Sequence, residues 1–151
     1  MAFLTYVLGS LGEIEHIRTV NHLDYLIDAL ESADWPLFFD NLNTLLASIN
    51  YELHIKKERY YQTIFYLIFK LMGLEIGAEV HTNRGRIDVV IETDEAIYIF
   101  EFKLNGSAED ALNQIQEKGY AEQYRLTGKH IHLIGANFEL VQRAVTDWKA
   151  V

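Results

Sequence analysis

The segment 96–100, with the sequence AIYIF, is apolar at every position, and it constrains the fold more than any other part of the chain. Successive side chains of a strand point to opposite faces of its sheet, so this strand must be covered on both faces. Helical patterns lie before and after it in the sequence and can supply both layers. The sequence therefore predicts an α/β fold, with a central sheet flanked by helices.

Three consecutive strands are expected, at 78–82, 86–92 and 96–103, with turns at 83–85 and around 94–95. A helix should start after Ser107, because Ser107 can cap the helix N-terminus and Glu109 and Asp110 follow it in the first turn. The chain stays helix-like through Tyr124 and breaks at Gly128. A fourth strand is expected at 131–136 and a closing helix at 139–149. The helical crossover between the third and fourth strands makes that pair parallel, so the sheet is mixed.

Three helices are expected before the sheet. One is capped by Asn21, one starts near Asp34 with Pro36 in its first turn, and the longest covers 57–72 and stops at Gly73. The aromatic residues of the long helix are interpreted as core packing rather than as a base-stacking platform; they are Tyr60, Tyr61, Phe65 and Tyr66. Residues 1–53 are interpreted as a helical appendage or linker, and residues 54–151 as the main domain.

Composition excludes several classes of protein. The chain has no cysteine, which removes disulfides and thiolate metal sites and is compatible with a reducing cytoplasm. Its most apolar stretch, 60–74, is about 15 residues long and contains Lys70, whereas a membrane helix needs about 20 apolar residues. The first residues lack the basic start of a secretory signal. We expect a cytoplasmic protein without a membrane segment.

The formal net charge is −9, which argues against a general nucleic-acid binder because phosphate contacts need Lys and Arg. The acidity is concentrated at the start of the chain. Residues 1–55 carry one basic residue, Arg18, against eight acidic ones. The remainder, which contains the expected sheet, is close to neutral.

The polar end of the third strand carries the candidate chemistry. Glu101 and Lys103 share one face of that strand, because residues two apart point the same way. If the preceding turn has a two-residue loop, Asp88 falls opposite Glu101. Two carboxylates placed so close need a shared proton or a cation. A divalent metal would be held by both carboxylates, by the backbone carbonyl of Phe102 and by water.

Other interpretations of these residues remain open. Asp88, Glu101 and Lys103 are also compatible with an ordinary solvated sheet face, and a one-residue slip in register would turn Asp88 away from Glu101. His130 and His132 share a strand face, but the sequence offers no third ligand beside them for a metal site.

The string GRIDVVIETDEAIYIFEFK, which contains Asp88 and Glu101-Phe102-Lys103, resembles the PD-(D/E)XK nuclease superfamily. The expected order from the long helix onward is similar to the αβββαβ core of that superfamily, which has the restriction-endonuclease-like fold. The strings ERYYQTIFYLIFKLMGL, ALNQIQEKGYAEQY and LIGANF resemble a subgroup found C-terminal to AAA-ATPase-like domains. The proline of the superfamily's name is absent, since Ile87 precedes Asp88, and the chain has no GxxxxGK[ST] phosphate loop.

The resemblance implies a role for individual residues. Asp88 and Glu101 would be metal ligands, and Lys103 would position the nucleophilic water. Glu58 would support the metal or the lysine, and Gln114 would be an accessory polar residue near the substrate. Arg86 and Glu79 also match the subgroup, with Arg86 as a substrate contact. Each has a structural alternative, for instance a first-turn helix acid for Glu58 and an ion-pair partner for Arg86.

The resemblance implies a Mg²⁺- or Mn²⁺-dependent endonuclease acting on DNA, although RNA fits the same chemistry because a carboxylate–metal site acts on the phosphate. A catalytically silent module that docks on an AAA-ATPase-like domain, in the same or another chain, is the alternative. A homodimer is compatible with either interpretation.

Overall fold

The computed structural model describes residues 16–48 and 58–151, and within them it contains a five-stranded mixed sheet in the order β1-β2-β3-β4-β5. The strands are β1 (Ala78–Asn83), β2 (Arg86–Glu92), β3 (Ala96–Leu104), β4 (His130–Glu139) and β5 (Ala144–Ala150). The first three form an antiparallel meander, β4 is parallel to β3, and β5 is antiparallel to β4. The expected α/β fold with a mixed, helix-flanked sheet is confirmed.

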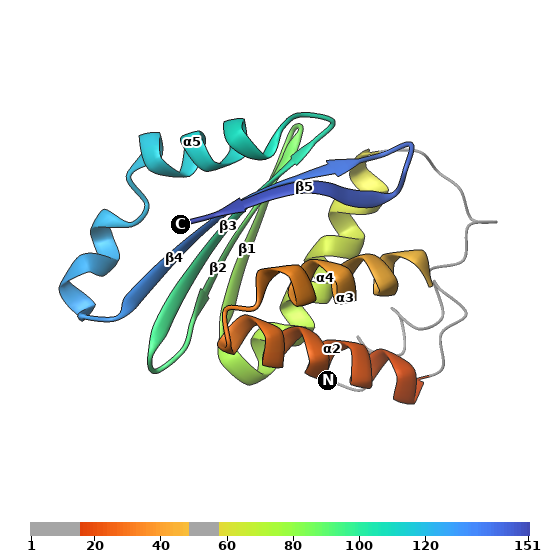
Figure 1. The fold of residues 1–151 in the computed structure, drawn as a ribbon, viewed down its shortest axis with the longest axis horizontal. Coiled ribbons are helices and arrows are strands. Elements are labelled where there is room, and N and C mark those ends of the chain that lie inside the picture. The colour runs from red at the N-terminus through yellow and green to blue at the C-terminus, as the bar shows by residue number, and fades with distance from the viewer. Residues whose placement is uncertain (1–15, 49–57) are drawn as a thin grey trace.

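Both faces of the sheet are covered, as the apolar segment 96–100 requires. Helices α2 (His16–Glu31), α3 (Trp35–Ala47) and α4 (Glu58–Ile76) lie on one side, and α5 (Ala108–Lys118) lies on the other (Figure 1). Tyr98, Phe100 and Phe102 of β3 join the larger core beneath α3 and α4. Ile97 and Ile99 face the opposite way and pack with Ile115 of α5. The alternating side chains of β3 therefore contribute to two separate cores.

The helices α2 and α3 share the larger core with the sheet. Trp35 is 9% exposed, and its ring lies 6.0 Å from that of Phe100. Asp34 caps α3 as expected, since its carboxylate accepts a hydrogen bond from the Leu37 amide at 3.2 Å. The expected cap at Asn21 is wrong, because Asn21 lies inside α2. Asn in a helix interior costs only a fraction of a kcal/mol, about 0.7 at most, so tertiary packing overrides the capping signal.

The long helix α4 was expected to end at Gly73, but it continues to Ile76. The next residue, Gly77, has a left-handed φ of +73°. Gly73 is needed for another reason. A Cβ there would lie 2.7 Å from the Cβ of Ala78, so the helix can approach β1 only without a side chain at this position. Tyr61 and Phe65 are buried as expected, but Tyr66 is 42% exposed and is not part of the core.

The chain after α5 differs from its expected course in two places. α5 ends at Lys118 with Gly119 in the left-handed conformation, and a 3₁₀ helix, η2 (Glu122–Thr127), follows it. The expected helix through Tyr124 is therefore interrupted.

The expected closing helix at 139–149 is wrong, because β5 occupies this segment. The backbone of β5 pairs with β4, and Asn43 of α3 bonds both the N–H and the carbonyl of Val145. These long-range bonds override a helix-like apolar spacing.

Among the described residues, no helix is both long and apolar enough to cross a membrane.

Candidate active site

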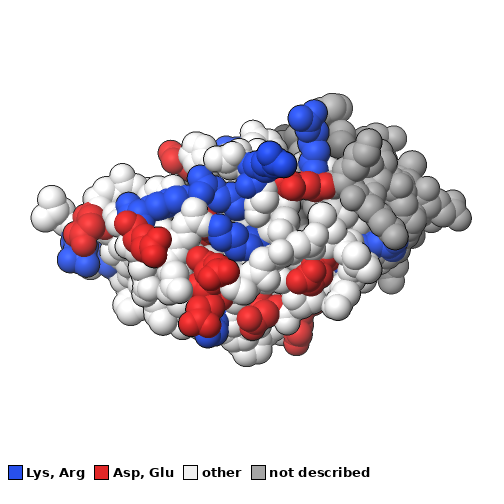
Figure 2. Space-filling view, turned by 90° about the horizontal axis from the view of Figure 1, so that it is seen from above, with Lys and Arg blue, Asp and Glu red and all other residues white. Residues whose placement is uncertain are grey.

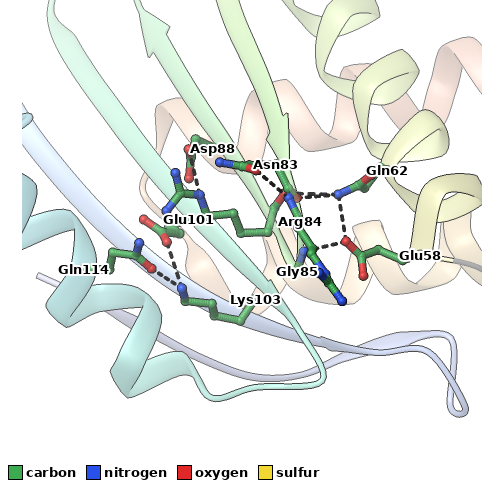
Figure 3. Close-up of polar contacts among 10 residues, drawn as sticks. Glu58, Gln62, Asn83, Arg84, Gly85, Asp88, Glu101, Lys103 and Gln114 are labelled. Atoms are coloured by element: carbon green, nitrogen blue, oxygen red, sulfur yellow. Dashed lines mark hydrogen bonds and ion pairs between the residues drawn. The ribbon is translucent and has the colours of Figure 1, made fainter.

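Asp88, Glu101 and Lys103 lie on the α5 side of the sheet, near the end that is turned toward the β1–β2 hairpin (Figure 3). Asp88 on β2 pairs directly with Glu101 on β3, which confirms the register expected from the sequence. The two-residue loop at 94–95 fixes that register, since the amide of Thr93 donates to the carbonyl of Ala96 at 2.9 Å. The carboxylates of Asp88 and Glu101 therefore meet across two adjacent strands.

Glu101 is buried, with 1% of its surface exposed. Burial raises the pKa of its carboxyl group, and the negative charge of Asp88 raises that pKa further. The charge of Lys118 and the ammonium of Lys103, whose Nζ lies 3.3 Å from Glu101 Oε1, act in the opposite direction. Glu101 Oε1 therefore has the Lys103 ammonium as its partner, whereas Oε2 of Glu101 and Oδ1 of Asp88 are buried without a hydrogen-bond partner within the described structure. Such orphaned acceptors are costly unless a proton or a cation satisfies them.

Lys103 is held between the sheet and α5. Its ammonium donates a hydrogen bond to Oε1 of Gln114, which reaches down from α5, and it forms the ion pair with Glu101 (Figure 3). The position of α5 depends on Gly135 of β4, the residue paired with Glu101. A Cβ at Gly135 would lie 2.5 Å from the Leu112 amide nitrogen and 2.6 Å from the Ala108 oxygen. The absence of a side chain there allows α5 to sit close enough for Gln114 to meet Lys103.

Arg86 lies next to the pair of carboxylates. Its Nε is 3.6 Å from Asp88 Oδ2, and both side chains are largely shielded from solvent. The guanidinium is therefore an ion-pair partner of Asp88, as the structural alternative stated, and it also supplies positive charge at the edge of the site.

Two residues near the carboxylates are absent from the sequence-based set. The pKa of the Tyr120 phenol is raised by burial and by the charge of Asp88, so this side chain lies within electrostatic reach of the site. The ammonium of Lys118 is 5.6 Å from the centroid of the Tyr120 ring. In the sequence, only the string Lys118-Gly119-Tyr120 could have indicated that these two side chains lie near the site. That conclusion requires knowing that Gly119 ends the helix and turns Tyr120 back toward the sheet.

Within the described structure, the carboxylate of Glu58 forms hydrogen bonds with partners other than Asp88 and Glu101. Its Oε1 accepts hydrogen bonds from the backbone amide of Gly85 and from Nε2 of Gln62. Gln62 also donates to the carbonyl of Asn83 at 2.6 Å. Figure 3 places Glu58 and Gln62 on one side of the β1–β2 hairpin, and Asp88 and Glu101 on the other. In this arrangement Glu58 secures the hairpin that carries Arg84 and Arg86.

Two further candidates lie elsewhere. Glu79 of β1 lines a different groove, together with Glu31 and Glu92. His132 stacks on Tyr98 with ring centroids 4.9 Å apart, and burial, together with the charge of His130, lowers its pKa. His130 and His132 therefore belong to an aromatic cluster rather than to the carboxylate site.

The chemistry of the site fits a hard divalent cation. Residues 16–48 and 58–151 contain no cluster of three or more His, Asp or Glu side chains able to hold a metal, so Asp88 and Glu101 would be the side-chain ligands. The side chain of Phe102, between Glu101 and Lys103, is fully buried in the core on the other face, so Phe102 could offer a metal only its backbone carbonyl. Mg²⁺ is commonly bound by one or two carboxylates and several waters, so two carboxylates that each have a buried oxygen without a partner match it.

Comparison with known proteins identifies the family. The profile of the PD-(D/E)XK nuclease superfamily matches residues 56–148, more than half of the chain. A protein of Azotobacter chroococcum mcd 1, named "Uncharacterized protein in vnfD 5'region", is 35% identical over 130 residues, which cover 82% of this chain. The same alignment covers 25% of that relative, so the chain spans about a quarter of its length. No solved structure matches. The matched segment contains all of the residues assembled above, and the chain belongs to the PD-(D/E)XK nuclease superfamily.

Proposed function

We propose that this chain is a metal-dependent phosphodiester hydrolase, an endonuclease with DNA as its substrate. One observation carries the proposal: Asp88 and Glu101 face each other, each with one buried oxygen that lacks a partner, beside the ammonium of Lys103. Membership of a nuclease superfamily supports the same reaction. A divalent cation, Mg²⁺ or Mn²⁺, bound by the two carboxylates would stabilise negative charge on the phosphate.

The protein's own groups would then act on the attacking water and on the substrate. The ammonium of Lys103, anchored by Gln114 and Glu101, would orient that water and would stabilise negative charge on the phosphate. Arg86 would contact the substrate next to Asp88. Glu58 would act through the β1–β2 hairpin rather than by touching the reacting atoms, so it is a positioning residue in this proposal.

The direct test is cleavage of plasmid DNA, single-stranded DNA and RNA with Mg²⁺ or Mn²⁺. The wild type should cleave, EDTA should abolish the cleavage, and Asp88→Asn and Lys103→Ala should each reduce it by at least about 100-fold, because each removes a group that stabilises the transition state. Arg125→Ala, purified identically, is the control for contaminating nucleases, since Arg125 is 68% exposed and pairs with Glu122 away from these carboxylates. Cleavage that persists in Lys103→Ala would contradict the assignment.

Metal binding can be measured apart from catalysis. Saturating Mn²⁺ should raise the melting temperature of the wild type, because a ligand at about 100 times its Kd stabilises the native state by about 2.7 kcal/mol. Asp88→Asn should lose most of this shift. A metal-dependent shift without any cleavage would favour the second function, a silent nuclease-fold module that docks on an AAA-ATPase-like domain or on another copy of the chain.

A further inference from the structure

We propose that the groove between α4 and the β1–β2 hairpin binds the nucleic-acid strand that continues from the phosphate to be cut. This inference rests on the proposed function, since it assigns a substrate contact beside the same site. The groove has a volume of about 650 Å³, and α4 and the hairpin form its walls. Arg59 and Tyr66 line it from α4, and Asn83 and Arg84 line it from the hairpin.

The charges available in this groove favour an anionic ligand. Arg59 and Arg84 are both exposed, and neither forms an ion pair with a residue of the described structure. Among the described lining residues, Glu58 is the carboxylate, and its Oε1 already accepts bonds from Gly85 and Gln62. The two guanidinium groups therefore remain available for phosphate oxygens, which they can bind through paired N–H groups.

The groove and the candidate active site lie on opposite sides of the β1–β2 hairpin (Figure 3), so a strand that occupies both would pass over the hairpin. Arg84 lies at the hairpin tip, and Arg86 follows it and pairs with Asp88. Arg84 and Gly85 form the turn before β2, so at about 3.3 Å per residue Arg84 lies at most roughly 13 Å from Asp88. A nucleic-acid strand carries one charge about every 3.4 Å of helix axis, so this length corresponds to at most about four nucleotides.

Tyr66 adds a surface for stacking. It is 42% exposed, although the neighbouring Phe65 on the same helix is fully buried. The ammonium of Lys70 lies 5.7 Å from the centroid of the Tyr66 ring. Aromatic rings next to positive charges are the usual platform for bases of a single strand. The face of the molecule seen from above also carries a band of Lys and Arg side chains, despite the overall net charge of −9 (Figure 2).

The test measures the affinity for labelled oligonucleotides with Mg²⁺ in a Lys103→Ala background, in which cleavage should be at least about 100-fold slower than in the wild type. Arg84→Ala should weaken binding about tenfold, and Arg59→Ala with Arg84→Ala should weaken it further, because charge-assisted bonds to phosphate are lost. Each substitution should also make the negative slope of log K against log salt shallower by about 1. The matched control, Arg125→Ala, should change the affinity by less than about twofold. Melting temperatures of all variants check that they are folded.

Strand length gives a second, independent readout. Removing about four nucleotides from one end of the oligonucleotide should weaken binding in the background protein, and should weaken it much less in the double Arg variant. Single-stranded DNA, duplex DNA and RNA are compared to identify which phosphodiester strand the groove takes. Equal affinity of the double variant and its background, or no binding of any of the three by the background protein, would overturn the inference.

Failure of the proposed function would look different. If the chain with Lys103 intact cuts none of the three substrates, but binding still depends on Arg59 and Arg84, the groove stands as a strand-binding site and the hydrolase proposal falls. If the chain cuts a substrate but its affinity for oligonucleotides is unchanged by the Arg59 and Arg84 substitutions, the hydrolase proposal stands and the groove assignment falls.

Discussion

Glu101 lies in the central strand with 1% of its surface exposed, and Asp88 stands directly opposite it on β2. Burial and the charge of Asp88 both raise the pKa of Glu101 above its ordinary value of 4.5. In the absence of a cation, ionising Glu101 in the folded protein is therefore harder than ionising it in the unfolded chain. The same carboxylate that would bind a metal should weaken the metal-free fold.

This conflict gives a pH prediction. Between pH 4.5 and the raised pKa, the folded state binds more protons than the unfolded state, so stability falls as pH rises through this window. In EDTA, the free energy of unfolding of the wild type should decline over that window relative to Glu101→Gln, which cannot ionise. Urea unfolding at a series of pH values measures both proteins.

The control for this prediction is Glu117→Gln, which alters an exposed carboxylate on α5. Its stability should follow the wild type across the pH series. If the free energy of unfolding of Glu101→Gln changed with pH as that of the wild type does, ionisation of Glu101 would not destabilise the folded state.

At the scale of elements, the meander of β1, β2 and β3 could be predicted together with its register. The alternation of buried and polar residues fixes the faces, and the short loop at 94–95 fixes the pairing of Asp88 with Glu101. These are local signals. They were sufficient to place Asp88, Glu101 and Lys103 on one face, whereas Gln114 came from the family resemblance alone.

Elements that depend on distant partners could not be predicted. The segment that forms β5 has a helix-like apolar spacing, and only β4 and Asn43 of α3 hold it as a strand. Likewise, Tyr120 enters the neighbourhood of Asp88 because α5 ends at Gly119. Gly73 has the sequence character of a helix end, yet its position is set by contact with Ala78. In each case tertiary contacts decide between local options of similar free energy.

The packing of α5 on β4 leads to a prediction about Gly135. Gly135→Ala places a methyl group against backbone atoms of Ala108 and Leu112, which cannot move without shifting the helix. The free energy of unfolding should fall by about 1–3 kcal/mol, the usual cost of overpacking. Because Gln114 moves with α5, DNA cleavage should also fall at temperatures where the variant is fully folded.

Urea unfolding and the cleavage assay test the two parts of this prediction. Leu126→Ala is the control, since Leu126 is 99% exposed and should change stability by no more than about 0.5 kcal/mol. Wild-type stability in Gly135→Ala would mean that α5 can move away from β4 without cost. Normal cleavage in the folded variant would mean that Gln114 does not position Lys103.

At the scale of the whole molecule, the proposed function requires an acidic chain to bind an anionic polymer. The net charge of −9 repels nucleic acid at long range, and residues 1–55 contribute most of the acidic excess. The basic side chains of the groove and of the carboxylate site are few: Arg59, Arg84, Arg86, Lys103 and Lys118. Binding should therefore depend on a small number of close phosphate contacts rather than on a broad positive surface.

The salt dependence of binding tests this view. Each phosphate neutralised on a duplex contributes about −0.9 to the slope of log K against log salt, so three contacts by Arg59, Arg84 and Arg86 predict a slope of about −3. Fluorescence anisotropy with duplex DNA and Mg²⁺ from about 50 to about 200 mM salt, in the Lys103→Ala protein, measures it. A slope steeper than about −6 would mean that many more side chains of the Lys and Arg band in Figure 2 contact phosphate, which would contradict this view. A slope near zero would mean that the arginines do not contact phosphate, and substrate affinity would then have to come from the metal and from stacking alone.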